Sequence, residues 1–197
     1  MATGRPGRFM RVITAFVLAA AIPFASHAAD VRPMIKVGID TGGDALLTQV
    51  FPTGEIETIK ANEGFYLGGG VSVTNFYRDL ELEVSLTFKY TTAYGTSGQV
   101  DWTRYPLDTL VFYRWSRMRA GGGLTYHFGP KLKGEGDVAG VDVKFDNALG
   151  FVLQADYRIT DYLTVGVRYT AIEYETKASP AVTTKSSGIG ITLGMSF

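Results

Sequence analysis

The sequence predicts an all-β fold, an up-and-down antiparallel transmembrane β-barrel of eight strands. Stretches of about ten residues alternate apolar and polar side chains with period two, which is typical of strands with one apolar face. Tight turns and long polar connections alternate strictly along the chain. An even strand number, with both termini on the side of the short turns, is what a closed membrane barrel requires. We therefore expect short turns at one end and long loops at the other.

The first 28 residues have the pattern of a secretory signal peptide. Arg5, Arg8 and Arg11 precede an apolar run at 12–25, and Ser26-His27-Ala28 supplies the small residues that signal peptidase reads. That run of 14 residues is shorter than the roughly 20 that a membrane-spanning helix needs. We predict that residues 1–28 are removed and that residues 29–197 form one barrel domain.

The composition excludes several classes of function. Residues 29–197 carry 16 basic and 19 acidic side chains, so no basic excess exists to attract nucleic acid. The chain has no cysteine, which excludes disulfide bonds, thiol catalysis and thiolate metal sites. After residue 28, no apolar run approaches the length of a spanning helix.

The strands are predicted from the alternation of apolar and polar residues, and the turns from the short polar segments between them. In residues 80–90, alternate apolar residues from Leu80 to Tyr90 oppose a polar set from Glu81 to Lys89. Tight turns are predicted at 77–79, 115–117 and 159–161, and long polar loops at 43–62, 92–104, 129–147 and 176–185. The eight predicted strands are 33–42, 63–76, 80–91, 105–115, 117–128, 148–158, 162–175 and 186–197.

Two features favour a membrane barrel over a soluble secreted barrel or sandwich, which would show the same alternation. Aromatic residues gather near strand ends, where interfacial girdles lie. The residues that the alternation places inside the barrel also carry more charge than the dry core of a soluble protein could bury. The predicted girdle residues are Tyr77, Tyr90, Tyr105, Tyr113, Trp115, Tyr157, Tyr162, Tyr169 and Phe197. The predicted lumen charges are Lys36, Asp40, Glu81, Glu83, Lys89, Asp108, Arg114, Arg117, Arg119, Asp156, Arg158 and Arg168.

The last quarter of the chain resembles a known family. Residues 150–175, GFVLQADYRITDYLTVGVRYTAIEYE, with their aromatic-Arg-x-Thr-Asp turn, are similar to a hairpin of the small outer-membrane barrels of the outer-membrane protein W and opacity-protein type. The final strand GIGITLGMSF alternates strictly, and its terminal Phe197 resembles the C-terminal assembly signal of outer-membrane barrels. The resemblance implies a porin-like or opacity-like outer-membrane protein of a Gram-negative cell envelope, with the C-terminal strand recognised by the barrel-assembly machinery.

The charged inner face is the most informative feature for function. An eight-stranded barrel is only just wide enough for its side chains to fill it, so opposite charges are expected to form an ion-paired plug. The competing hypothesis is a narrow basic path for small solutes, or a lateral entry for apolar molecules, as the family resemblance implies. The orientation of Leu110 and Phe112 is ambiguous, since they face lipid if Arg114 lies at the interface.

Signals for catalysis and for metal binding are weak. His127 is the only histidine after residue 28, and only Thr125, two positions away, offers a hydroxyl on its face. The acidic residues Glu135, Asp137, Asp142 and Asp146 lack the spacing of a calcium loop and are predicted to be solvated. The glycine runs 68–70 and 121–123 have no phosphate-binding context; we expect them to let the wall bend and to make room for large inner side chains.

We therefore predict a non-enzymatic outer-membrane barrel with a structural or surface-recognition role, and no catalytic residue, cofactor or metal site. Its expected partners are outer-membrane lipid and lipopolysaccharide, whose phosphates Lys131 and Lys133 are placed to touch, and the barrel-assembly machinery. One alternative is a narrow channel for small solutes, which predicts a single-channel conductance that falls when Arg117 or Arg119 is altered. A second alternative is a lipid A-modifying enzyme that depends on His127.

Overall fold

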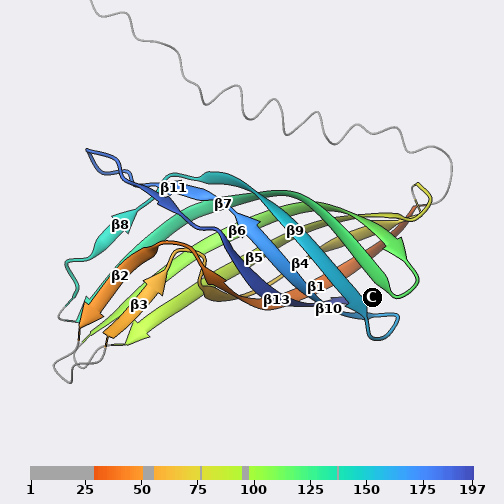
Figure 1. Cartoon of the computed structure of the whole chain (residues 1–197), viewed down its shortest axis with the longest axis horizontal. Coiled ribbons are helices and arrows are strands. Elements are labelled where there is room, and N and C mark those ends of the chain that lie inside the picture. The colour runs from red at the N-terminus through yellow and green to blue at the C-terminus, as the bar shows by residue number, and fades with distance from the viewer. Residues whose placement is uncertain (1–28, 51–55, 76, 95–97, 137) are drawn as a thin grey trace, which may run out of the picture.

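The computed structural model describes residues 29–50, 56–75, 77–94, 98–136 and 138–197. The predicted signal peptide lies outside these residues. Figure 1 shows a tilted barrel, with the C-terminus and the start of the first strand at one end and small extra strands at the other. Among the described residues, no helix is long and apolar enough to span a membrane.

Eight antiparallel strands form a closed ring, which confirms the predicted fold class. Successive wall strands pair with each other, and the first and last wall strands pair to close the ring. This last pairing closes the sheet, so no wall strand is left as an unpaired edge. The wall strands are β1 (Asp30–Gly42), β4 (Gly64–Thr74), β5 (Leu80–Tyr94), β6 (Gly98–Trp115), β7 (Met118–Gly136), β9 (Ala148–Arg158), β10 (Leu163–Ala171) and β13 (Gly188–Ser196).

The long connections are more structured than the sequence predicted. Most of the predicted loops 92–104 and 129–147 is strand, because β5, β6 and β7 continue together beyond the rest of the wall. The error came from the polar residues in these stretches: many of them, such as Asp101 and Lys133, lie on the outer face, while Val100, Trp102 and Leu132 alternate inward. The connections at this end of the barrel also hold the short strands β2 (Ala45–Val50), β3 (Ile56–Lys60), β8 (Asp142–Lys144), β11 (Glu173–Glu175) and β12 (Thr183–Lys185).

The opposite end of the barrel carries the tight turns. Trp115 pairs with Met118, so Ser116 and Arg117 alone connect β6 to β7. Ser116 has a φ of 52° and Arg78, in the turn before β5, a φ of 43°. The left-handed conformation of Ser116 suits a two-residue hairpin turn, whose twist matches that of the strands. Both ends of the described ring, Asp30 and Ser196, lie at this short-turn end.

The outer surface is a band of exposed apolar residues between two aromatic girdles. All nine predicted girdle residues are exposed, and so are Ile189, Ile191, Leu193 and Met195 of the last strand. Tyr105 and Trp115 lie ten positions apart on β6. With a rise of about 3.3 Å per residue and a strand tilt of about 40°, this spacing gives a band about 25 Å tall, the height of the apolar band in membrane barrels.

Glycine allows the strands β4 and β5 to approach closely. A Cβ at Gly68 would overlap the carbonyl oxygen of Leu86, and one at Gly70 would overlap that of Val84. Gly69, between them, points outward, where a Cβ would come no closer than 3.3 Å to the carbonyl oxygen of Met34. The inner glycines of the run thus bring the two strand backbones together, in addition to making room in the lumen.

Candidate functional site in the barrel lumen

Arg119 is the centre of an ion-pair group inside the barrel. Its Nη1 lies 2.5 Å from Glu81 Oε1 and its Nη2 lies 2.9 Å from Glu83 Oε2, both on β5. Its Nε donates to Asp156 Oδ2 on β9 over 2.7 Å. One guanidinium therefore binds three carboxylates from the strands on either side of β6 and β7. The planar fork of arginine permits this arrangement, which the single ammonium of lysine would not reproduce.

Lys36 and Arg168 extend this group across the lumen. Lys36 Nζ lies 2.5 Å from Glu83 Oε1 and 4.0 Å from Asp108 Oδ2. Arg168 Nη1, on β10, lies 3.0 Å from the same Asp108 oxygen, on β6. All four side chains are nearly or fully buried. Each of these buried charges lies beside an opposite charge, and this pairing offsets the otherwise large cost of removing the charges from water. The ion-pair group forms the first layer of the interior.

A further ion pair connects the lumen to the first long connection. Lys89 Nζ lies 2.5 Å from Asp40 Oδ2 and donates to Asn62 Oδ1 over 3.1 Å. Asn62 lies between β3 and β4, and its Nδ2 donates to the carbonyl oxygen of Thr41 over 3.4 Å. The loop is therefore bound to the charged interior rather than free above it.

The structure brings nine of the twelve predicted lumen charges together in the interior. Arg114 and Arg158 are half-buried at the short-turn mouth. Arg117 lies in the turn between β6 and β7 and is exposed, so its predicted lumen position was wrong. The parity argument failed there because a two-residue turn interrupts the alternation on which it depends. The nine interior residues are Lys36, Asp40, Glu81, Glu83, Lys89, Asp108, Arg119, Asp156 and Arg168.

Arg104 is an interior charge that sequence reasoning missed, because residues 92–104 were interpreted as a loop. It is fully buried, and its Nη2 donates to the carbonyl oxygen of Glu63 over 2.6 Å. Its guanidinium carbon lies 5.0 Å from the centroid of Trp102. The alternation of Val100, Trp102 and Arg104 with outward Asp101 and Thr103 was the signal available in the sequence.

Leu110 and Phe112, whose orientation the sequence left open, face the lumen. Both are fully buried and pack with Val152 of β9. The guanidinium carbon of Arg119 lies 4.2 Å from the Phe112 ring centroid. The interior is therefore apolar on one side of the ion-pair group, which shields the salt bridges from water on that side.

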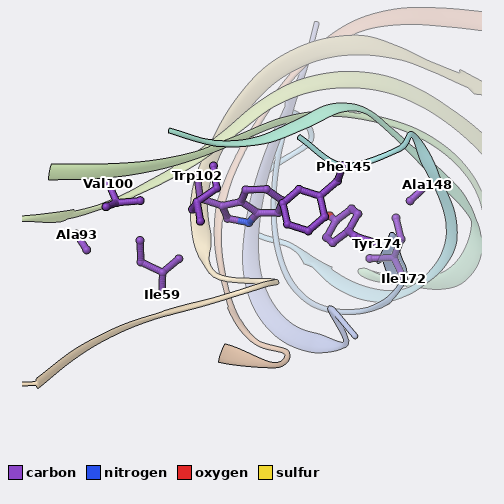
Figure 2. Packing of buried hydrophobic residues seen from close by; sticks show 9 residues of the cluster. Ile59, Ala93, Val100, Trp102, Phe145, Ala148, Ile172 and Tyr174 are labelled. Carbon is purple, nitrogen blue, oxygen red and sulfur yellow. The ribbon is translucent and has the colours of Figure 1, made fainter. Parts of the chain in front are cut away.

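A second layer, the apolar cluster, fills the long-loop end of the barrel. Figure 2 shows Trp102 at its centre, with Phe145 and Tyr174 beside it. The Trp102 centroid lies 5.1 Å from that of Phe145 and 5.5 Å from that of Tyr174, and its Nε1 donates to the carbonyl oxygen of Ala61 over 3.0 Å. The buried members are Ile59, Ala93, Val100, Trp102, Leu132, Phe145, Ala148, Ile172 and Tyr174.

His127 lies between the two layers. It is buried, and its Nδ1 is 2.6 Å from the hydroxyl of Tyr174. Thr125 is buried on the same face of β7. A catalytic histidine needs an accessible substrate beside it, whereas this one is covered by the apolar cluster on the loop side.

The acidic residues of the third long connection form ion pairs with lysines. Glu135 lies 2.8 Å from Lys133, Asp142 lies 3.4 Å from Lys131 and Asp146 lies 3.9 Å from Lys177, all exposed or half-exposed. Asp137 lies outside the described residues. In the described part of the chain, no three His, Cys, Asp or Glu side chains are grouped as metal ligands would be.

Comparison with known proteins relates this geometry to a fold. No protein-family model and no curated protein matches the sequence. The structure is similar to that of Ail, the attachment invasion locus protein of Yersinia pestis, with a TM-score of 0.51 and 10% identity over 85% of this chain and 97% of Ail. The chain has the fold of the small eight-stranded outer-membrane β-barrels.

Two further structures show the extent of this likeness. Ail in complex with the heparin analogue sucrose octasulfate matches with a TM-score of 0.51 and 11% identity, over 87% of this chain and 100% of that one. Neisserial surface protein A matches with a TM-score of 0.48 and 13% identity, over 87% of this chain and 100% of that one. The two Ail structures, together with the closed ring of eight strands, confirm the small-barrel fold that the strand pattern predicted.

Proposed function

We propose that this protein is an exported integral protein of the Gram-negative outer membrane with a closed lumen, and that its long loops carry out recognition at the cell surface. The observation that carries the proposal is the filling of the interior at two levels. The ion-pair group around Arg119 occupies the barrel, and the apolar cluster around Trp102 covers it on the loop side. A barrel filled in this way serves as a rigid support for its loops.

The membrane location is supported by the outer surface. An apolar band about 25 Å tall between aromatic girdles is what a lipid bilayer requires of a barrel. The inverted distribution, with charges inside and Ile189, Ile191 and Leu193 exposed, would be unfavourable in water. The short turns then face the periplasm and the long connections face the exterior.

Planar-bilayer conductance of the refolded protein tests the closed lumen. We expect no discrete openings from a preparation whose folded state is shown by heat-dependent electrophoretic migration. Discrete openings would contradict the closed lumen and favour the channel alternative. Arg119→Gln and Arg117→Gln then form a matched pair, because a path through the interior responds to the first and not to the second.

The absence of catalysis is part of the same proposal. The only described histidine, His127, is buried beside Tyr174, below the apolar cluster, which leaves no approach for an acyl chain from outside. We expect the lipid A mass spectrum of cells expressing the protein to match that of cells lacking it. A mass change that His127→Ala abolishes would show that the protein is a lipid A-modifying enzyme.

Lipopolysaccharide is the proposed partner at the outer rim. Lys131 of β7 and Lys144 of β8 occupy directly paired positions, just beyond the exposed Phe128. Lysines at this level face the phosphates of the outer leaflet. We expect Lys131→Gln with Lys144→Gln to weaken lipopolysaccharide binding, and Arg78→Gln, at the opposite end, to leave it unchanged. Equal binding by all forms would contradict this assignment.

The barrel-assembly machinery is the proposed partner of the C-terminal strand. Phe197 is exposed, and its backbone N–H donates to the carbonyl oxygen of Pro33 over 2.9 Å at the seam between β13 and β1. An exposed terminal aromatic on the closing strand is available before the seam forms. We expect deletion of Phe197 to reduce the amount of barrel in the outer membrane and Phe197→Trp to retain it. Full assembly of the deletion variant would contradict the role.

A further inference from the structure

The short-turn mouth of the barrel contains a polar pocket of about 670 Å³. Arg114 from β6 and Arg158 from β9 line it, together with the hydroxyl-bearing residues Ser72, Thr74, Thr164 and Ser196. Three carboxylates also border the pocket, those of Asp30, Glu81 and Asp161. The two strands flank β7, so the arginines approach the pocket from either side of one wall strand. Donors from β6 and β9 therefore face a concave space that opens away from the long loops.

The two arginines differ from the other cations of this pocket in having no acidic partner. Arg32 is paired with Asp30 over 2.6 Å, and Arg119 is saturated by its three carboxylates. Among the described residues, neither Arg114 nor Arg158 makes an ion pair within 4.0 Å. The mouth consequently keeps two guanidinium groups without an ion-pair partner, whereas each interior carboxylate of the network binds a cation.

Arg114 also has a side-chain donor without a hydrogen-bond acceptor. Its Nε is buried and has no hydrogen-bond partner in the described structure. A buried donor without an acceptor is unfavourable, and more so when it is charged. An oxyanion relieves this cost, because phosphate and carboxylate oxygens accept two parallel N–H bonds from one arginine fork.

We propose that this pocket is an oxyanion-binding site that takes a phosphate or carboxylate group from the periplasmic side, held by Arg114 and Arg158. Arg119 and Glu81 border the pocket toward the lumen and are already bound to each other. A bound anion therefore stays at the mouth and does not continue into the interior. The site goes beyond the proposed role of the loops, since it lies at the other end of the barrel.

Titration with inorganic phosphate tests the site in the refolded protein, in a phosphate-free maltoside detergent. Amide resonances of β6 and β9 near Arg114 and Arg158 are followed by NMR. We expect saturable shifts, and a weakening of about tenfold in both Arg114→Gln and Arg158→Gln, the size expected for loss of one charge-assisted contact. Electrophoretic migration of each variant confirms that it is folded.

Arg117→Gln is the matched control, because it removes one exposed arginine from the adjacent turn and leaves the pocket lining unchanged. It is expected to bind phosphate as the original protein does. Shifts without saturation, or an equal weakening in Arg117→Gln, would overturn the proposal in favour of general attraction to a basic rim.

Two further titrations identify the source of the group. Succinate replaces phosphate in one, and bicelles containing phosphatidylglycerol replace the detergent in the other. Saturable, Arg114-dependent shifts with the soluble anions assign the site to a periplasmic solute, and such shifts with the lipid alone assign it to a headgroup of the inner leaflet. Failure of all three probes would refute the site without affecting the closed lumen, which conductance tests separately.

Discussion

Arg168 and Asp108 form a salt bridge of 3.0 Å between strands that do not touch. Arg168 lies on β10 and Asp108 on β6, with β9 and β7 between them along the ring. The pair thus spans the lumen and fixes the separation of two parts of the wall. Lys36 lies 4.0 Å from the same carboxylate oxygen, so three strands meet at one residue.

We expect this cross-lumen pair to show energetic coupling in a double-mutant cycle. Asp108→Asn and Arg168→Gln each leave a buried charge without its main partner, whereas the double variant removes both. Residues in one network couple by about 0.5–3 kcal/mol, and we expect a value in the upper part of that range. Urea unfolding of the four proteins in lipid vesicles measures it. Strict additivity would contradict a direct pair.

Replacement of Arg119 by methionine should be the most destabilising change in the network. It leaves Glu81, Glu83 and Asp156 buried without their common partner. Breaking a buried pair by removing one member costs about 3–5 kcal/mol of unfolding free energy. Arg117→Met is the control, since an exposed position is expected to change stability by no more than about 0.5 kcal/mol. Similar urea midpoints for both variants would count against the central role of Arg119.

The glycine run in β4 predicts opposite outcomes at adjacent positions. Gly70→Ala places a Cβ against the carbonyl oxygen of Val84 and should cost about 1–3 kcal/mol, as overpacking does. Gly69→Ala points outward, meets only one atom at 3.3 Å, and should be nearly neutral. Refolding yield and urea midpoint compare the two. A Gly70→Ala variant as stable as Gly69→Ala would contradict the close approach of β4 and β5.

An arginine introduced on the lipid-facing surface should destabilise the barrel more at the bilayer midplane than near the interface. Leu153 is in register with Gly122, which pairs with Val111, about halfway between the girdle residues on β6. Leu153→Arg should therefore cost about 2–4 kcal/mol in a bilayer, the midplane value for a barrel. Ile159→Arg, at the short turn after β9, should cost no more than about 1 kcal/mol. Equal effects would contradict the placement of the bilayer on this band.

Truncation of Trp102 should loosen the long-loop end and spare the barrel. Burying such a side chain contributes about 3–5 kcal/mol, judged from aromatic-to-alanine substitutions. In Trp102→Ala we expect faster amide hydrogen exchange in β3, which supplies Ile59 to the cluster. Exchange in β1 and β13, which close the ring, should be unchanged. Uniformly faster exchange would show that the cluster supports the whole barrel instead.

Much of the wall could be predicted from the sequence because strand parity is a local property. In β5, Glu81, Glu83 and Lys89 are buried while Leu86, Phe88 and Tyr90 are exposed, as alternation required. The same rule placed the apolar side of β13 outside. It succeeded wherever a strand was bounded by recognisable turns, and it failed at Arg117, where the turn itself resets the alternation.

The sequence by itself determined the strand number, the inside-out distribution of charge and the girdles, because each depends on side chains within about ten residues of one another. Only the tertiary structure decided which carboxylate each cation binds, since closure of the ring brings Arg168 to Asp108 across 60 positions. It also showed that most of two expected loops is wall, and it buried Trp102 among residues from five other strands and from the connection that holds Phe145. These contacts depend on barrel curvature and strand stagger, which no local pattern specifies.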